Sequence, residues 1–505
     1  MPKAKGVRII LFLKKIQVMI KGIAEKHKWL ILVLVCFGAI FAATSFLNHY
    51  NFRTYGWDLG INQNAIFDYA HFRWNDCMIM QPSFDNVLAD HFSLYPLLIS
   101  PFYWVFGSYT MLIFQWSAIL FGGIGIYKFV FLISDHRRFA TLATVHFFCI
   151  WGIYSALSFD YHDNVVAAMF VPWFLYYYKK EALLKSVLFF VLILISKENM
   201  ALWAGFIGLG LSFRHLINKE WKRLKISSAM MIGAFLYFIL ILKVVIPSLS
   251  NTDGVYLHHS FNALGGNFGE VIVNIIKHPI RASELLFENH SGDSYYDGIK
   301  AETYLAIILA GGWALVFYPE YLIMIVPILA QKMYNDLPIR WGISDHYSIE
   351  FVPIIVIALY TFLNGLENKK LKLTAVMVGI CAVSTFKFME NRTSEYYKKD
   401  NTRFYAPVHW GRNFDVENVH QVLATIPDSL RVSAQAPLAP HLAFRDYIYH
   451  YPYKGDANCI ALLTAEENKY PFNEVTYQEE IDRLLNSGEW NVFAKTPALL
   501  ILTKK

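Results

Sequence analysis

Charged side chains are scarce in this sequence. Only 17% of the 505 residues are Asp, Glu, Lys or Arg, whereas 55% are hydrophobic and 17% are aromatic. A soluble chain usually has about a quarter charged residues, so this deficit indicates a chain that folds largely in lipid. A net charge of +6 can indicate nucleic-acid binding, but here the basic residues are sorted by loop, which excludes that class.

Cysteine pairs and common catalytic motifs are also lacking. The five cysteines form no CxxC pair and show no zinc-ligand spacing. Cys77 and Cys459 are both expected on the external side, so a disulfide between them stays open. No Gly-rich phosphate loop, GxSxG or HExxH occurs in a suitable context, so nucleotide-driven and serine-hydrolase chemistry have no support.

Long apolar runs make up most of the chain. The run Trp29–Asn48 is long enough to cross a bilayer, and residues 1–28 before it hold eight Lys and Arg against one acid, Glu25. That excess predicts a cytoplasmic N-terminus. Ten further runs bring the predicted spans to eleven, at 109–133, 139–157, 164–178, 183–196, 199–213, 226–247, 301–317, 320–333, 347–364 and 371–388.

Basic residues concentrate in alternate loops between these runs. They lie at 137–138, 179–185, 214–225 and 369–372, whereas Asp recurs in the loops at 49–91 and 158–163. This asymmetry predicts cytoplasmic basic loops, and the odd number of spans leaves the C-terminus outside. The apolar block 92–107 fits this alternation only as a helix that lies in the outer interface or re-enters it. We therefore expect a multi-pass protein of a bacterial-type inner (cytoplasmic) membrane.

The predicted fold class is an all-α polytopic membrane protein with a small soluble C-terminal α/β domain. Its parts are a basic cytoplasmic N-terminus over 1–28, a transmembrane domain over 29–388 with external loops 49–108 and 248–300, and an extracytoplasmic domain over 389–505. In this last part the apolar patterns predict strands at 430–434, 459–463 and 498–503, and helices at 415–425 and 477–487.

Candidate functional residues gather at the expected outer boundary. Asp58 and the pair Asp90–His91 lie in the first external loop. A carboxylate near a membrane is costly unless it is paired or used, and it can act as a general base or bind a metal ion. A solvated loop that merely carries acids remains the alternative for these three residues.

Two further groups lie at the same boundary. Asp160 and His162 belong to a tight turn between spans, which can hold a cation, face an anionic headgroup or simply be polar. Lys197 and Glu198 lie between two apolar runs with almost no loop, and they can neutralise each other, or Lys197 can meet a phosphate. Arg340 and His346 precede a late span and suit the binding of a lipid phosphate.

The motifs at these positions resemble those of an uncharacterised family of bacterial polytopic membrane proteins. The chain has WDLG, DHFS, FDYHDN, SKEN, SDHY and, at 439–445, APHLAFR. The family pattern is FDLG, DHFSP, a KE pair, an HY pair and PHLA in this order, over about residues 50–505. Trp57 replaces the usual Phe, and Leu94 replaces the usual Pro.

That family is in turn similar in layout to the GT-C superfamily of glycosyltransferases, which use polyprenyl-phosphate sugars. The resemblance implies Asp58 as catalytic base and Asp90 as a second acid or metal ligand. It also implies Lys197, Arg340 and His346 near the donor phosphate, and it leaves open a divalent cation bound by Asp58, Asp90 and His91.

The leading hypothesis is therefore transfer of a sugar from a lipid-linked donor to an acceptor at the outer leaflet, with membrane lipids and no nucleic acid as partners. One alternative is a lipid or solute transporter or flippase. The other is a non-catalytic assembly protein that docks its partners through the C-terminal domain, for example through His441 or Arg445.

Overall fold

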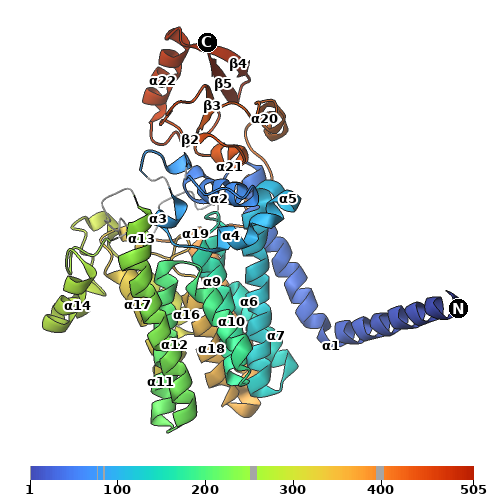
Figure 1. Ribbon diagram of the computed structural model, residues 1–505. Helices are drawn as coiled ribbons and strands as arrows, with labels where there is room; N and C mark the ends of the chain where they lie inside the picture. Colours follow the sequence, from blue (N-terminus) through green and yellow to red (C-terminus); the bar gives the residue numbers. More distant parts are fainter. Residues whose placement is uncertain (1, 77, 84–85, 251–258, 394–402) are drawn as a thin grey trace.

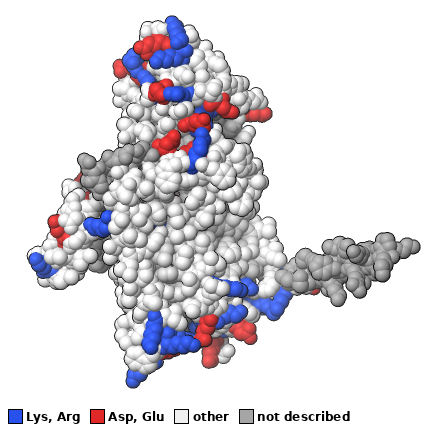
Figure 2. All heavy atoms as spheres, viewed as in Figure 1, with Lys and Arg blue, Asp and Glu red and all other residues white. Residues whose placement is uncertain are grey.

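The computed structural model describes residues 2–76, 78–83, 86–250, 259–393 and 403–505, with only the backbone described for 2–21, 23 and 24. Figure 1 shows a bundle of helices that carries a small sheet on one end. We call this the sheet end of the bundle and the opposite end the far end. Figure 2 shows that charged side chains gather toward the two ends of the molecule and are few in the band of the bundle between them.

The bundle is built from the apolar runs of the sequence, because a helix satisfies its own backbone hydrogen bonds where no water is available. Its helices are α1 (Pro2–Tyr50), α6 (Thr110–Ser134), α7 (Arg137–Cys149), α8 (Trp151–Leu157), α9 (Asp163–Lys179), α10 (Leu183–Leu194), α11 (Glu198–Ile217), α12 (Trp221–Leu240), α16 (Ile299–Leu309), α17 (Pro319–Met333), α18 (Phe351–Asn364) and α19 (Lys370–Glu390).

Five helical segments in the described residues are long and apolar enough to cross a membrane, or six if the bent pair α7 and α8 forms one span. The eleven predicted spans are therefore not confirmed as a set. A helix needs about 20 residues to cross the hydrocarbon core, and α10 and α18 have only 12 and 14 residues. The five segments are Glu25–Tyr50, Tyr95–Ser134, Glu198–Ile217, Trp221–Leu249 and Glu367–Glu390.

The block predicted to lie in the interface is a chain of short helical pieces that leads into α6. These are α4 (Tyr95–Ile99), η3 (Ser100–Phe102), α5 (Tyr103–Phe106) and η4 (Gly107–Tyr109). Trp104 and Val105 are more than half exposed at 63% and 71%, and Leu97 and Leu98 are also exposed. An exposed apolar face of this kind is typical of a segment that lies against lipid.

Residues 432–504 form a five-stranded mixed sheet in the order β2-β1-β3-β5-β4. The strands are β1 (Val432–Ala434), β2 (Ile448–His450), β3 (Cys459–Leu463), β4 (Trp490–Lys495) and β5 (Leu499–Lys504), and the helices beside them are α20 (Val416–Leu423), α21 (Ala439–Leu442) and α22 (Glu474–Asn486). Strand β1 pairs in parallel with β2 and β3, while β5 runs antiparallel to β3 and β4. The strands predicted at 430–434, 459–463 and 498–503 are confirmed, and β2 and β4 were not foreseen.

Residues 49–91, which were predicted to form the first external loop, lie between the bundle and the sheet, and we call them the outer segment. It contains the π-helical turn η1 (Gly56–Gly60), α2 (Ile61–Ala70), η2 (Met78–Met80) and α3 (Val87–Asp90). Phe52, Ile61 and Tyr69 are buried in the same apolar cluster as Val432 and Ile501 of the sheet. The outer segment and the C-terminal sheet therefore share one core.

The chain from the end of the predicted span 226–247 into the predicted external loop 248–300 forms η5 (Ile241–Val245), α13 (Ile246–Leu249), α14 (Phe268–Lys277) and α15 (Pro279–Leu285). Helix α14 protrudes from the bundle (Figure 1) and exposes Ile272 and Ile276 at 59% and 73%. Such an amphipathic helix suits the surface of a membrane.

Close helix contact at glycine gives a first prediction. A Cβ atom on Gly210 of α11 would lie 2.3 Å from the backbone oxygen of Glu320 in α17, and backbone cannot yield as a side-chain tip does. We expect Gly210→Ala to destabilise the bundle by about 1–3 kcal/mol, as overpacking does. Thermal unfolding in detergent measures the change.

Gly233→Ala on α12 is the matched control, because nothing lies within 4 Å of a Cβ at that position. It should leave the melting temperature unchanged or raise it slightly, since Ala favours helix over Gly. Equal effects of the two substitutions would contradict the tight contact between α11 and α17.

Candidate functional site

A polar cavity of about 320 Å³ lies at the sheet end of the bundle, beneath the outer segment. The outer segment, the turn before α9, the start of α11 and the loop before α18 each contribute to its wall. The lining residues are Trp57, Asp58, Ile61, Asn62, Met80, Val87, Asp90, His91, Ser93, Tyr161, His162, Asp163, Lys197, Arg340, His346 and Tyr347.

Asp58 is held in the turn η1, and its side chain is 35% exposed. Its Oδ1 lies 3.2 Å from Nε2 of His162, whose ring stacks on that of His346 with centroids 3.6 Å apart. Burial, followed by the nearby charge of His162, lowers the pKa of His346 well below its usual value. A neutral His346 can therefore pack against His162 without charge repulsion while Asp58 faces the cavity.

Asp160 does not line this cavity. It supports the turn that carries Asp58. Its carboxylate accepts a 2.7 Å hydrogen bond from the backbone N–H of Tyr55, and its own backbone has a positive φ of 53°. Burial, with the charge of Asp58 as a second cause, raises the pKa of Asp160 well above its usual range. The substrate contact expected of Asp160 thus stays a prediction, while the structure gives it a positioning contact.

Lys197 and Glu198 face different partners. Glu198 is buried, and its carboxylate bonds to Nδ1 of His91 at 2.9 Å and to the N–H of Phe92 at 3.2 Å. Lys197 lines the cavity, and within the described residues no carboxylate lies within 4 Å of its ammonium group. The two adjacent charges therefore do not neutralise each other, and Lys197 is left to face the cavity.

Arg340 is a second cation on the cavity wall. Its guanidinium lies 5.1 Å from the ring centroid of Tyr347, and in the described part of the chain it forms no ion pair while its Nε atom has no hydrogen-bond partner. The loop that carries it is anchored by Lys332, whose Nζ donates 2.8 Å bonds to the carbonyl oxygens of Arg340 and Gly342. Two cations without carboxylate partners make this wall suitable for a phosphate.

A smaller chamber of about 100 Å³ adjoins the polar cavity and shares His91, Lys197, Arg340, His346 and Tyr347 with it. We call it the apolar chamber after one side of its wall, while the charged residues Glu198, Lys332 and Glu350 also line it. Its apolar wall comes from α11, α12, η5, α14, α17 and the chain before α14, through Leu202, Phe238, Leu242, Phe261, Phe268 and Ile328. The shared cations therefore stand between the polar cavity and the chamber that has this apolar side. This arrangement matches a ligand with a phosphate between a polar group and a hydrocarbon chain.

The C-terminal domain touches the turn that carries Asp58. The indole N–H of Trp57 donates a 3.2 Å hydrogen bond to Nδ1 of His450. A Cβ on Gly56 would lie 2.9 Å from the ring of His450 and 3.1 Å from Cβ of Ala439, so only glycine fits there without a shift. Asn64 of α2 also donates to the carbonyl oxygen of Ala443 at 3.0 Å.

Most of the predicted site residues converge. Asp58, Asp90, His91, His162, Lys197, Arg340 and His346 line the polar cavity, Glu198 lines the apolar one, and Asp160 lies behind the wall. Residues not foreseen as site residues include Asn62, Tyr161, Lys332 and Glu350. Lys332 and Glu350 were detectable, because each is a charged residue at the end of an apolar run, as Lys197 is.

The structure does not confirm the metal site or the disulfide considered from the sequence. Among the described residues no group of three or more His, Cys, Asp or Glu side chains is placed to hold a metal ion, so the cation expected at Asp58, Asp90 and His91 stays a prediction. Cys459 is a buried free thiol, and its suggested partner Cys77 lies outside the described residues.

The sequence matches, over residues 48–498, the family described as "Predicted membrane protein (DUF2079)". The chain belongs to this family. No curated protein matches the chain. The match covers both the outer segment and nearly all of the C-terminal domain, so the two parts that share a core also belong to one family unit. The expected membership of a membrane-protein family is confirmed, and its description carries no activity.

A buried acid beside the site gives a prediction of pH dependence. Asp345, with a positive φ of 58°, is buried, and neither carboxylate oxygen has a hydrogen-bond partner in the described residues. Burial raises its pKa from 3.8 to about 8, although Arg392 acts in the opposite direction. The folded state therefore keeps a proton that the unfolded state releases, and this group makes stability fall as pH rises from about 4 to about 8.

We expect Asp345→Asn, which cannot titrate, to flatten this dependence. Thermal unfolding of both proteins between pH 6 and 8.5 measures it, with the wild type losing more stability across the range. Parallel curves for the two proteins would show that Asp345 is not the titrating group.

Proposed function

We propose that this protein is a membrane glycosyltransferase that moves a sugar from a polyprenyl-phosphate donor to an acceptor hydroxyl at the outer leaflet. The observation that carries the proposal is the shared wall of the two cavities. There the unpaired cations Lys197 and Arg340 stand between a polar chamber that contains Asp58 and an apolar chamber. The layout resemblance to GT-C glycosyltransferases supports the same reading, as an analogy of fold.

In this mechanism the acceptor oxygen attacks the anomeric carbon of the donor sugar while Asp58 takes the hydroxyl proton. A new glycosidic C–O bond forms as the C–O bond to the phosphate breaks. The electron pair of the broken bond leaves with the polyprenyl phosphate, whose negative charge Lys197 and Arg340 stabilise. A single displacement of this kind inverts the anomeric configuration.

The remaining groups have supporting roles in the proposal. His162 orients the Asp58 carboxylate from 3.2 Å, and Glu198 holds His91 and the backbone of Phe92 in place. The apolar chamber accommodates the first part of the polyprenyl chain. The exposed apolar residues of α14, which also contributes Phe268 to that chamber, would let the donor arrive from the membrane surface.

The proposed topology has eleven spans, with the N-terminus in the cytoplasm and the C-terminal domain outside an inner membrane. The charge distribution supports it. The basic stretches 137–138, 179–185, 214–225 and 369–372 connect or begin helices at the far end of the bundle, opposite the sheet. Helices shorter than a full span would then be accommodated by local thinning of the bilayer or by packing against neighbouring helices.

The central test is Asp58→Asn. We expect it to lower release of polyprenyl phosphate at least a hundredfold, because a general base contributes about 10²–10⁴ in rate. The assay uses purified protein in liposomes of bacterial lipid extract, with release followed by mass spectrometry. Asp76→Asn is the matched control, since Asp76 lies in the same outer segment and does not line the cavity.

Full activity of Asp58→Asn would remove Asp58 from the mechanism. Movement of the lipid across the bilayer without a new glycosidic bond would identify a flippase and end the transferase proposal. Unchanged melting temperatures in both variants would show that any loss is chemical.

The cation pair gives a separate prediction about binding. We expect Lys197→Gln and Arg340→Gln each to reduce the amount of lipid-linked phosphate that co-purifies with the protein by about tenfold, as loss of a charged hydrogen bond does. Mass spectrometry of extracted lipids gives the amounts. Lys185→Gln is the control, because this exposed lysine lies in α10 near the far end. Equal lipid content in all variants would contradict a phosphate at this wall.

A further inference from the structure

A further cavity of about 640 Å³ lies near the far end of the bundle, away from the site described above. It is formed where α1 meets α6 and α7. Four cations line it, Lys26 and Lys28 from α1 and Arg137 and Arg138 from the start of α7, against a single acid, Glu25.

These four cations, Lys26, Lys28, Arg137 and Arg138, form no ion pair with any Asp or Glu in the part of the chain that the structure describes. Among the described residues, Glu25 is the one carboxylate that lines the cavity against these four cations.

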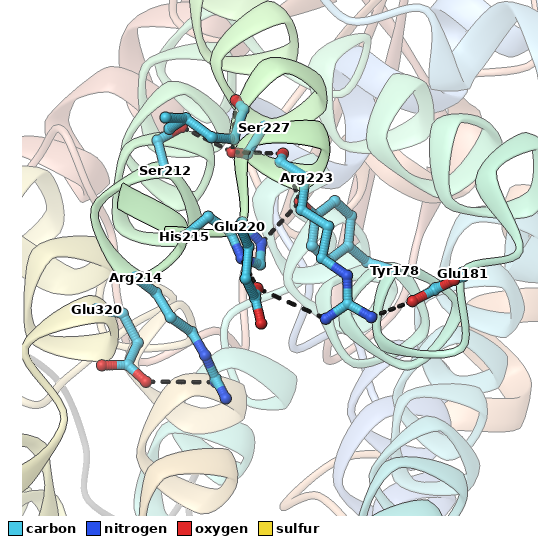
Figure 3. Close-up of polar contacts among 10 residues, drawn as sticks. Tyr178, Glu181, Ser212, Arg214, His215, Glu220, Arg223, Ser227 and Glu320 are labelled. Atoms are coloured by element: carbon cyan, nitrogen blue, oxygen red, sulfur yellow. Dashed lines mark hydrogen bonds and ion pairs between the residues drawn. The ribbon is translucent and has the colours of Figure 1, made fainter. Parts of the chain in front are cut away.

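Other arginines at the far end are balanced, as Figure 3 shows. Arg214 pairs with Glu320 at 3.4 Å, and Arg223 pairs with both Glu181 and Glu220. The charge asymmetry of membrane proteins explains why this end is basic. It does not explain why Arg214 and Arg223 each pair with an acid, whereas Arg137 and Arg138 form no ion pair in the residues that the structure describes.

The bend of α1 builds the cavity. His27 has non-helical backbone angles, φ −117° and ψ 16°, and its Nδ1 lies 3.2 Å from the hydroxyl of Tyr127 on α6. This contact fixes the point where α1 reaches the bundle. The lysines on either side of His27 consequently line the same cavity as the two arginines.

The rest of the wall is apolar and open to lipid. Trp29 and Leu32 line the cavity and are 60% and 50% exposed, and Leu142 and Val145 of α7 complete the wall. A small free anion would make no favourable contact with this apolar surface. An acyl chain would cover it while a headgroup met the cations.

We propose that this cavity binds an anionic phospholipid, with its phosphate on the four cations and its first acyl carbons along Trp29 and Leu32. Basic pockets between membrane helices are suited to anionic headgroups. The lipid would come from the leaflet at the far end, so this site is independent of the sugar transfer proposed for the sheet end.

The test measures lipid binding to the delipidated full-length protein in detergent by native mass spectrometry. The probes are dioleoyl phosphatidylglycerol and dioleoyl phosphatidylcholine, which share acyl chains and differ in net charge. We expect at least tenfold tighter binding of the anionic lipid. The double variant R137Q/R138Q should abolish this preference, whereas the control K179Q/K180Q, which removes two charges at the same end outside the cavity, should keep it.

A replacement variant and a competition experiment complete the test. If R137Q/R138Q fails to fold, K26Q/K28Q on α1 replaces it and should lose the preference equally. Inorganic phosphate at millimolar concentration should not displace the phospholipid. Equal affinity for the two lipids, an equal loss in the control, or displacement by phosphate alone would each overturn the proposal.

Discussion

Phe52, Ile61 and Tyr69 of the outer segment pack into the same apolar core as Val432 and Ile501 of the C-terminal sheet, and the candidate site depends on that packing. The outer segment buries these side chains against the sheet, so its order depends on that packing. Joined, they hold the turn η1 rigidly above the bundle. The hydrogen bond from Trp57 to His450 and the close fit at Gly56 then fix where Asp58 lies.

Charge pairing sorts the residues of the site into two groups. Glu198 and Lys332 are buried and fully engaged, the first with His91 and Phe92 and the second with backbone carbonyls. A buried charge without partners would be strongly destabilising, so these contacts stabilise the loops that they join. Lys197 and Arg340 are only partly buried and have no carboxylate partner among the described residues, which leaves their charge available to a ligand.

Most residues of the candidate site were predictable from the sequence, because an ionisable side chain near the membrane is energetically costly unless it is paired or used. Asp58, Lys197, Arg340 and His346 stood out as ionisable residues beside apolar runs, and they do line one cavity. The role of Asp160 was not predictable, because it depends on a positive φ and on the distant N–H of Tyr55. The apolar chamber was also hidden, since its residues come from several helices and differ in no local way from other core residues. Hydropathy located the helical runs well, and the predicted runs 183–196 and 347–364 lie within four residues of the bounds of α10 and α18.

The shared core has a consequence for biosynthesis. The outer segment leaves the ribosome early, whereas the strands that complete its core are among the last residues made. Until those strands arrive, Phe52 and Ile61 have no apolar partners from the sheet, and the turn with Asp58 lacks the support of His450. A chain whose translation stops before the sheet would therefore lack the packing that holds the turn with Asp58 in place above the bundle.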